Sequence, residues 1–328
     1  MPLNSITNAE HLPLSLSTMI TKARRAIAGF FKLLQESMLE LLKNDPLRMA
    51  GATAFFTTFA LPPILVIIIQ FLKLVLNPTE VRLQLFGSLE NIIGHEAVGQ
   101  LVDVLRALRR LATNWYIIIG GFIFLLFVAT TLFKIIKSSI NQVWKIRPVH
   151  RLGLAKTMRS RLQAIAVILV AGLLFVFGLM AEGAQAFLGK YVFDLSPALT
   201  FYFRSTLSYI TSVVIVTIWF TVVFRYLPDG RPGWKVSLVG GFLTAILFAI
   251  GKIILHWMLS YSNINTVYGT SASIVLLLLF VFYSALILYY GAAFTKCYGI
   301  HTGRPIEPLH HAMHYRIIES DVEPKKEE

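Results

Sequence analysis

Residues 50–76 read AGATAFFTTFALPPILVIIIQFLKLVL, a long apolar run in which Lys73 is the single charged side chain. About 20 apolar residues in a helix cross the roughly 30 Å hydrocarbon core of a bilayer. Comparable segments occupy residues 113–136, 163–186, 205–225, 236–259 and 272–295. The sequence therefore predicts an all-α, polytopic membrane protein with six transmembrane helices in one domain, residues 46–296.

Composition supports a membrane protein over a water-soluble one. Of the 328 residues, 56% are hydrophobic and only 14% are charged, too few to cover the surface of a soluble globule. The single cysteine, Cys297, excludes a disulfide within the chain and a zinc site built from cysteines, and it is interpreted as an ordinary apolar thiol.

Three segments outside the six spans have their own patterns. Residues 1–16 are predicted to be a mobile arm, without the features of a secretory signal. Residues 17–45 place apolar side chains at helical spacing with basic residues between them, which predicts an amphipathic helix in the cytoplasmic membrane interface. Short amphipathic helices are expected on the external face within 77–112, where they either cap a cavity or lie on the lipid. The polar tail, residues 297–328, is predicted to be cytoplasmic and disordered.

Basic residues predict the orientation of the chain. Of its 30 Lys and Arg residues, 21 fall in residues 1–49, 137–162, 225–235 and 296–328, and five fall in the connections predicted on the opposite side. Lys and Arg concentrate in cytoplasmic loops. Both termini are therefore predicted to be cytoplasmic, and the net charge of +13 requires no nucleic-acid partner.

Pro62 and Pro63 lie in the middle of the first predicted span. Each removes a backbone donor, so the helix is expected to bend or break there, either as a packing kink or beside a cavity.

Several motifs, in order along the chain, resemble the YihY/BrkB family of bacterial inner-membrane proteins, whose members formerly carried the name ribonuclease BN. They are AGATAFFTTFALPPILVII (50–68), SINQVW (139–144), RYLPDGRPGWKVSLVGGFLTAILFAIGK (225–252), Asn265-x-x-Tyr268-Gly269, and Tyr283-Ser284-Ala285 through Gly291-Ala292. The resemblance implies an inner-membrane location and roles such as serum resistance and envelope lipid transport. The chain departs from the family where Gly-Ala-Glu is common, since it has Gly291-Ala292-Ala293, and where Trp is frequent, since it has Phe280.

Charged groups within the predicted spans are the first candidate site residues, because each costs about 2.5–3.5 kcal/mol to insert at the middle of a span. Lys252, His256, Glu182 and Lys73 all fall in the external half of the predicted bundle. Together they form a hypothetical binding site for an anionic head group. The alternative is structural: Lys73 reaches the interface, Glu182 pairs with Lys252, and His256 bonds to a neighbour.

Two loops supply further candidates. Asn263, Asn265 and Tyr268 belong to an uncharged external loop, 260–271, which either re-enters the protein and contacts a head group or makes a tight turn at Gly269. On the cytoplasmic side, Arg147, Arg151 and Arg159 are predicted to contact anionic lipid, although topology alone also requires their charge. His310, His311 and His314 are interpreted as a helical face of the tail and not as a metal site.

These patterns favour a transporter or flippase-like protein for an anionic amphiphile, either a phospholipid or a lipid-linked envelope precursor. The alternative is a non-catalytic scaffold that organises envelope proteins, and a ribonuclease is a remote third, because metal-assisted cleavage needs carboxylates or histidines that the cytoplasmic loops lack. No enzymatic activity, catalytic residue, cofactor, metal or nucleic-acid partner is expected. Membrane lipids are the expected partners, and the oligomeric state is left open.

Overall fold

The computed structural model describes residues 13–72, 86–87, 90, 98–99, 101–103, 106, 115–149, 170, 173–174, 177–178, 197–261 and 272–316. Its long helices are α1 (Pro13–Leu42), α2 (Pro46–Leu72), α5 (Trp115–Val143), α7 (Pro197–Tyr226), α8 (Trp234–Tyr261) and α10 (Ala272–His301). Four short strands complete the described elements: β1 (Ile146–Pro148), β2 (Gly230–Arg231), β3 (Glu307–Pro308) and β4 (Ala312–His314). The all-α prediction is confirmed.

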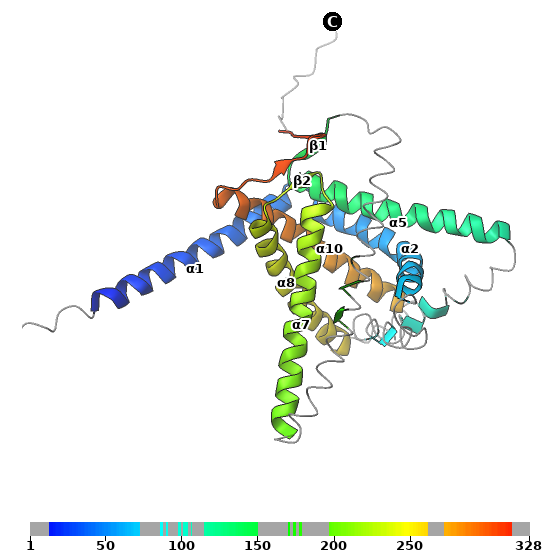
Figure 1. Ribbon diagram of the computed structural model, residues 1–328, viewed down its shortest axis with the longest axis horizontal. Helices are drawn as coiled ribbons and strands as arrows, with labels where there is room; N and C mark the ends of the chain where they lie inside the picture. Colours follow the sequence, from blue (N-terminus) through cyan, green and yellow to red (C-terminus); the bar gives the residue numbers. More distant parts are fainter. Residues whose placement is uncertain are drawn as a thin grey trace, which may run out of the picture.

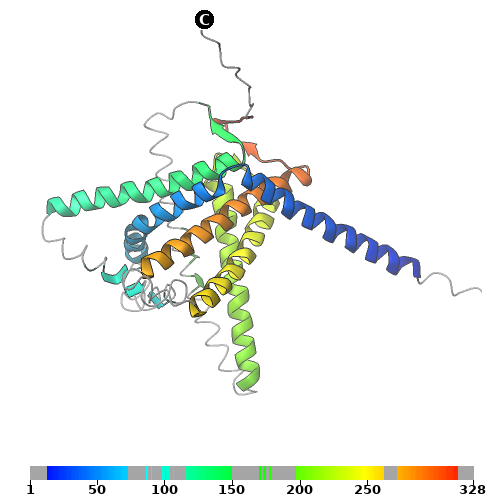
Figure 2. The same ribbon diagram turned by 180° about the vertical axis from the view of Figure 1, so that it is seen from behind.

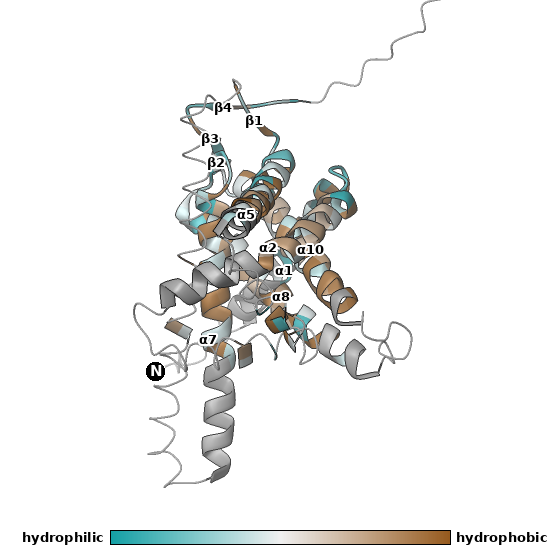
Figure 3. Cartoon of the chain, turned by 90° about the vertical axis from the view of Figure 1, so that its right-hand side faces the viewer, coloured by the Kyte–Doolittle hydropathy of each residue, from teal (hydrophilic) through white to brown (hydrophobic). Residues whose placement is uncertain are grey.

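Helix α10 lies at the centre of the packing and contacts α1, α2, α5 and α8 (Figure 1). Helix α7 packs on α8, and α2 packs on α5. Helices α1, α5, α7 and α10 end, and α2 and α8 begin, at the end of the bundle that carries the four strands. We call this the strand end. Figure 3 shows hydrophilic residues gathered around β2, β3 and β4, and hydrophobic colours along α7 and α10.

Within the described residues, three helical segments are long and apolar enough to cross a membrane: Tyr209–Tyr226, Trp234–Ile254 and Val275–His301. They match the predicted spans at 205–225, 236–259 and 272–295. The predicted spans 50–76 and 113–136 overlap α2 and α5. Most of the predicted span 163–186 lies outside the described residues, although positions 170, 173–174 and 177–178 are helical.

The loop between α1 and α2 ends one helix and starts the next as the sequence indicates. The amide of Asn44 donates to the Glu40 carbonyl oxygen at 2.7 Å, which caps the last turn of α1. Asp45 has a positive φ of 52°, a conformation that Asp tolerates better than most residues. Pro46 then opens α2 at a position where its missing N–H costs no helical bond.

A break at Pro62 and Pro63 is not observed, because α2 is helical from Pro46 to Leu72. Its ribbon instead changes direction in its C-terminal half (Figure 2). A proline removes one hydrogen bond and crowds the preceding turn, and a bend accommodates both effects without ending the helix.

Helices α8 and α10 approach closely through glycine. A side chain at Gly240 would meet Thr295, one at Gly251 would meet Tyr283, and one at Gly291 would meet Thr244. On the other side of α8, a Cβ at Gly241 would lie 2.9 Å from the Thr217 carbonyl oxygen of α7. Gly240, Gly241 and Gly251 therefore allow α8 to pack closely against its two neighbours.

Two predicted boundaries at the termini are wrong. Helix α1 begins at Pro13, so the predicted arm of residues 1–16 is too long. The described part of the tail, residues 297–316, is ordered: α10 continues to His301, and the following residues fold back onto the strand end. There β4 pairs antiparallel with β1 and β3 with β2. The tail has few apolar residues, but backbone pairing with earlier loops supplies order that composition does not reveal.

The predicted external helices receive partial support. Positions 86–87, 90, 98–99, 101–103 and 106 are helical, and Val98 is buried against Phe86, Val102, Leu277 and Phe280. Because Leu277 and Phe280 belong to α10, this segment packs on the bundle.

Candidate functional site

Lys252 is the candidate that the structure describes best. It lies on α8, inside a segment apolar enough to cross a membrane, and is half-buried. Its Nζ lies 5.9 Å from the centre of the Phe248 ring. Among the residues that the structure describes, no carboxylate lies within 4.0 Å of this ammonium group.

This environment stabilises the charge only in part. A lysine on the face of an aromatic ring gains about 0.5–2 kcal/mol, less than the roughly 2.5–3.5 kcal/mol that a charge costs at the middle of a span. The charge of Lys252 is therefore not fully compensated by its described surroundings, and an anionic group could supply the remainder.

Most of the other candidate site residues predicted from the sequence belong to segments that the structure does not describe. Lys73, Glu182, Asn263, Asn265, Tyr268, Arg151 and Arg159 lie outside the described residues, so the predicted bridge between Glu182 and Lys252 remains a prediction. His256 belongs to α8, one turn after Lys252. Arg147 is exposed on β1, with its guanidinium carbon 5.8 Å from the centre of the Tyr315 ring, so it is open to solvent or lipid head groups.

A second site, not identified from the sequence, is centred on Asp229 in the loop between α7 and α8. Lys137 of α5 donates to its Oδ1 at 2.8 Å, and Nε2 of His311 lies 2.9 Å from the same oxygen. Asn141 donates from Nδ2 to Oδ2 at 2.8 Å and accepts the Asp229 backbone N–H at 2.8 Å. We call these four residues the Asp229 cluster; it joins α5, the α7–α8 loop and the tail.

The Asp229 cluster favours an ionised carboxylate. Burial by itself raises the pKa of Asp229, whose side chain is only 6% exposed. The hydrogen bond and the charge of Lys137, followed by the hydrogen bonds of His311 and Asn141, outweigh burial and lower the pKa below its ordinary value of 3.8. The carboxylate is therefore a fixed negative charge at neutral pH.

Two features of the sequence are weak signals of this cluster. Asp229 is the single acidic residue in its loop, and His311 sits in a histidine-rich stretch. The interpretation of His310, His311 and His314 as one helical face is wrong, because His310 and His311 form a turn and His314 lies in β4. His311 faces Asp229, and Nε2 of His314 lies 3.1 Å from the Ile306 carbonyl oxygen.

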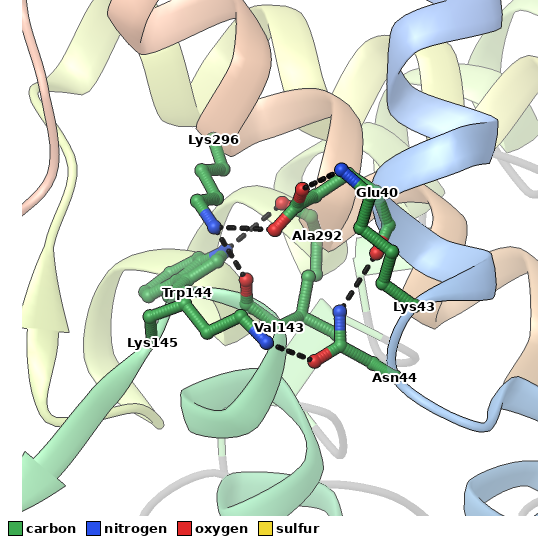
Figure 4. Close-up of polar contacts among 8 residues, drawn as sticks. All are labelled: Glu40, Lys43, Asn44, Val143, Trp144, Lys145, Ala292 and Lys296. Atoms are coloured by element: carbon green, nitrogen blue, oxygen red, sulfur yellow. Dashed lines mark hydrogen bonds and ion pairs between the residues drawn. The ribbon is translucent and has the colours of Figure 1, made fainter. Parts of the chain in front are cut away.

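A third group of polar contacts joins α10 to α1 and α5 at the strand end (Figure 4). Lys296 donates to the Glu40 carboxylate at 2.6 Å and to the Val143 carbonyl oxygen at 3.0 Å. The indole of Trp144, only 1% exposed, donates to the Ala292 carbonyl oxygen at 2.9 Å.

Lys145 completes this group. Its ammonium donates to Asn44 Oδ1 at 2.9 Å. Burial lowers the pKa of Lys145, the charge of Glu40 raises it, and the charges of Lys296 and Lys43 lower it further. Together with the Asp229 cluster, these contacts place the segments before α2, after α5, between α7 and α8, and after α10 at one end of the bundle, as expected from the distribution of basic residues.

The strand end is thus a layer of polar side chains that contact one another across several helices and loops. Within the described ranges, no three His, Cys, Asp or Glu side chains are grouped so that they could hold a metal ion.

Comparison with known proteins identifies the family that shares this sequence. Residues 38–313 match the model of the family described as Virulence factor BrkB. The chain belongs to the BrkB family. The match begins near the C-terminal end of α1 and ends in β4, so it includes all of α2, α5, α7, α8 and α10.

Curated relatives of this BrkB-family chain are named UPF0761 membrane proteins. The protein of Teredinibacter turnerae is 24% identical over 292 residues, which cover 88% of this chain and 65% of the relative. That of Haemophilus influenzae is 24% identical over 263 residues, which cover 76% and 88%. That of Actinobacillus pleuropneumoniae is 24% identical over 182 residues, which cover 54% and 61%. The chain thus spans less than two thirds of the Actinobacillus pleuropneumoniae and Teredinibacter turnerae relatives and most of the Haemophilus influenzae one. No solved structure matches it.

Proposed function

We propose that this BrkB-family chain is a non-enzymatic transporter or flippase-like protein of the bacterial inner membrane. Its substrate in this proposal is an anionic amphiphile, either a phospholipid or a lipid-linked envelope precursor. Both termini are cytoplasmic, so the strand end faces the cytoplasm.

The observation that carries the proposal is the position of Lys252. It lies 18 residues after the start of α8 at the strand end, about 27 Å away at 1.5 Å per residue. With the strand end in the cytoplasm, this ammonium group lies in the outer half of the membrane. A half-buried cation there, without an anionic partner among the described residues, is suited to an anionic head group.

The lipid class agrees with the surroundings of this cation. Several large apolar side chains on the same stretch of α8 are exposed: Ile250, Ile253, Ile254 and Trp257 are 47–64% exposed. A head group beside Lys252 would therefore have acyl chains beside these residues, whereas a small soluble anion would not use them.

Transbilayer movement of a fluorescent phosphatidylglycerol in vesicles tests the proposal. The purified full chain is reconstituted, and movement is followed by chemical quenching of the probe in the outer leaflet, with and without an imposed proton gradient. Wild type should accelerate movement, Lys252→Met should reduce the rate at least about tenfold, and Lys252→Arg should retain most of it, because a loss of about 1.4 kcal/mol is tenfold.

Lys134→Met is the matched control, because Lys134 is an exposed lysine on α5, another predicted span. It should move the probe at the wild-type rate. The proposal is wrong if wild type fails to accelerate movement under either condition, or if Lys252→Met is as active as wild type.

A scaffold is the second candidate, and α1 is the observation that favours it. Its C-terminal part packs on α10, whereas its N-terminal part extends away from the other helices (Figure 1). Deletion of the projecting residues 13–29 should then abolish capture of envelope proteins by cross-linking in cells and leave lipid movement unchanged. The transport proposal predicts that lipid movement, and not protein capture, depends on Lys252.

A further inference from the structure

Arg225, in the last turn of α7, holds its guanidinium group between aromatic rings. The guanidinium carbon lies 4.4 Å from the centre of the Trp234 ring and 5.9 Å from that of Tyr226. One Nη atom donates to the Pro232 carbonyl oxygen, which ties the side chain to the α7–α8 loop. The position of the guanidinium is therefore fixed by the protein before any ligand binds.

The charge of Arg225 is not neutralised by the described residues. None of their carboxylates lies within 4.0 Å of it, and its buried Nε has no hydrogen-bond partner. Asp229, the acidic residue of the same loop, is occupied by Lys137, Asn141 and His311. Since a guanidinium carries five N–H donors in a planar fork, donors remain for an oxyanion.

Further positive charge lies in the same α7–α8 loop and at the start of α8. Arg231 in β2 and Lys235 in the first turn of α8 are both exposed. The Arg231 backbone pairs with that of Glu307 across the β2–β3 ladder. Even with the Glu307 carboxylate in the neighbouring strand, Arg225, Arg231 and Lys235 leave a net positive charge in this region, which favours an anionic partner.

Exposed apolar side chains continue from the α7–α8 loop along both α7 and α8. The Tyr226 and Trp234 rings contact edge to face at 6.1 Å and are 43% and 57% exposed. From Trp234, Leu238 and Phe242 follow at four-residue intervals on α8; from Tyr226, Ile218 and Val214 follow on the same face of α7. These four are 42–52% exposed. Tyr and Trp at the end of an apolar helical surface are typical of the membrane interface.

We infer that Arg225, Trp234 and Lys235 form a binding site for the phosphate of an anionic phospholipid, whose acyl chains lie along the exposed faces of α7 and α8. The forked guanidinium contacts the phosphate oxygens, the Lys235 ammonium adds charge, and the Trp234 ring orients Arg225. The apolar surface that starts at the same residues selects a lipid over a soluble phosphate compound.

This site is separate from Lys252, which lies about 27 Å along α8, and it does not depend on transport. A protein that binds phosphatidylglycerol at Arg225 without moving it would contradict the proposed function and leave this inference intact.

Lipid binding to the full chain in detergent, measured by native mass spectrometry, tests the site. Phosphatidylglycerol is the probe, and the zwitterionic phosphatidylcholine is the comparison without net charge. Arg225→Gln should weaken phosphatidylglycerol binding about tenfold or more, and Lys235→Gln about fivefold, since each basic residue near anionic lipid contributes about 1 kcal/mol or more. Phosphatidylcholine binding should not change.

Two variants make the result decisive. Arg304→Gln removes another exposed arginine at the strand end and should bind phosphatidylglycerol like wild type. If Arg225→Gln unfolds, the exposed Lys235→Gln decides. Wild-type affinity in Lys235→Gln and in a folded Arg225→Gln overturns the inference, as does an equal loss in Arg304→Gln. Displacement of phosphatidylglycerol by inorganic phosphate would show a soluble-phosphate site and would also overturn it.

Discussion

Replacing Asp229 by Asn tests the account of the strand end most directly. The change keeps the shape of the side chain but removes the charge that Lys137 contacts at 2.8 Å. In either orientation, the new amide also places its N–H₂ group against a donor: Asn141 at the Oδ2 position or Lys137 at the Oδ1 position. Asn141 cannot relieve this conflict by rotating its amide, because its own oxygen accepts the Asp229 backbone N–H.

The magnitude follows from burial. Removing one partner of a buried ion pair costs about 3–5 kcal/mol. Lys137 and Asp229 are 14% and 6% exposed, so this pair is slightly open to solvent and the lower value of about 3 kcal/mol applies. At about 2 °C per kcal/mol for a chain of this size, the midpoint of thermal unfolding should fall by about 6 °C.

Cys297 provides the assay. It is the single cysteine of the chain and is partly buried in α10, next to Lys296. A thiol-reactive fluorogenic dye therefore reports the loss of packing at the strand end when the detergent-solubilised protein is heated. The midpoint of the dye signal is compared between Asp229→Asn and wild type.

The control is Asp45→Asn, which removes a carboxylate from the exposed pair with Arg48 at the same end. Asn also tolerates the positive φ at this position, so the midpoint should change by less than about 2 °C. Adding Lys137→Met to Asp229→Asn should restore part of the loss, because no unpaired cation then remains buried. A midpoint for Asp229→Asn within about 2 °C of wild type would refute the reasoning.

Two further predictions concern pH and helix packing. Because the pKa of Asp229 is lowered in the folded protein, mainly by Lys137, its contribution to stability is complete above about pH 4 and is lost as the pH falls below 3.8 through the folded-state value. Thiol reagents need the thiolate and react too slowly in acid, so tryptophan fluorescence follows the midpoint of thermal unfolding in this experiment. The midpoint should fall with pH in wild type, and Asp229→Asn should lack this acid limb. Gly291→Ala should lower the midpoint by about 2–6 °C, because the new Cβ would meet Thr244, a loss of about 1–3 kcal/mol. Gly51→Ala on α2, where a Cβ meets nothing within 4 Å, should leave it unchanged or raise it.

Features that act locally along the chain could be predicted from the sequence. The length and hydropathy of a helix that crosses a membrane are properties of one continuous segment. For this reason the predicted spans agree with the apolar segments of α7, α8 and α10. The end of α1 at Leu42 depends on Asn44 and Asp45, which are its neighbours in the chain.

Tertiary structure decided the arrangement of the polar groups. Asn141 and His311 reach Asp229 across 88 and 82 residues, and no spacing in a single sequence encodes such contacts. The polar composition of the tail predicts disorder. Its strands β3 and β4 nevertheless pair with β2 and β1, which lie in earlier loops. Hydropathy is additive along a segment, whereas an ion pair or a strand pairing exists only after folding brings distant residues to the same place.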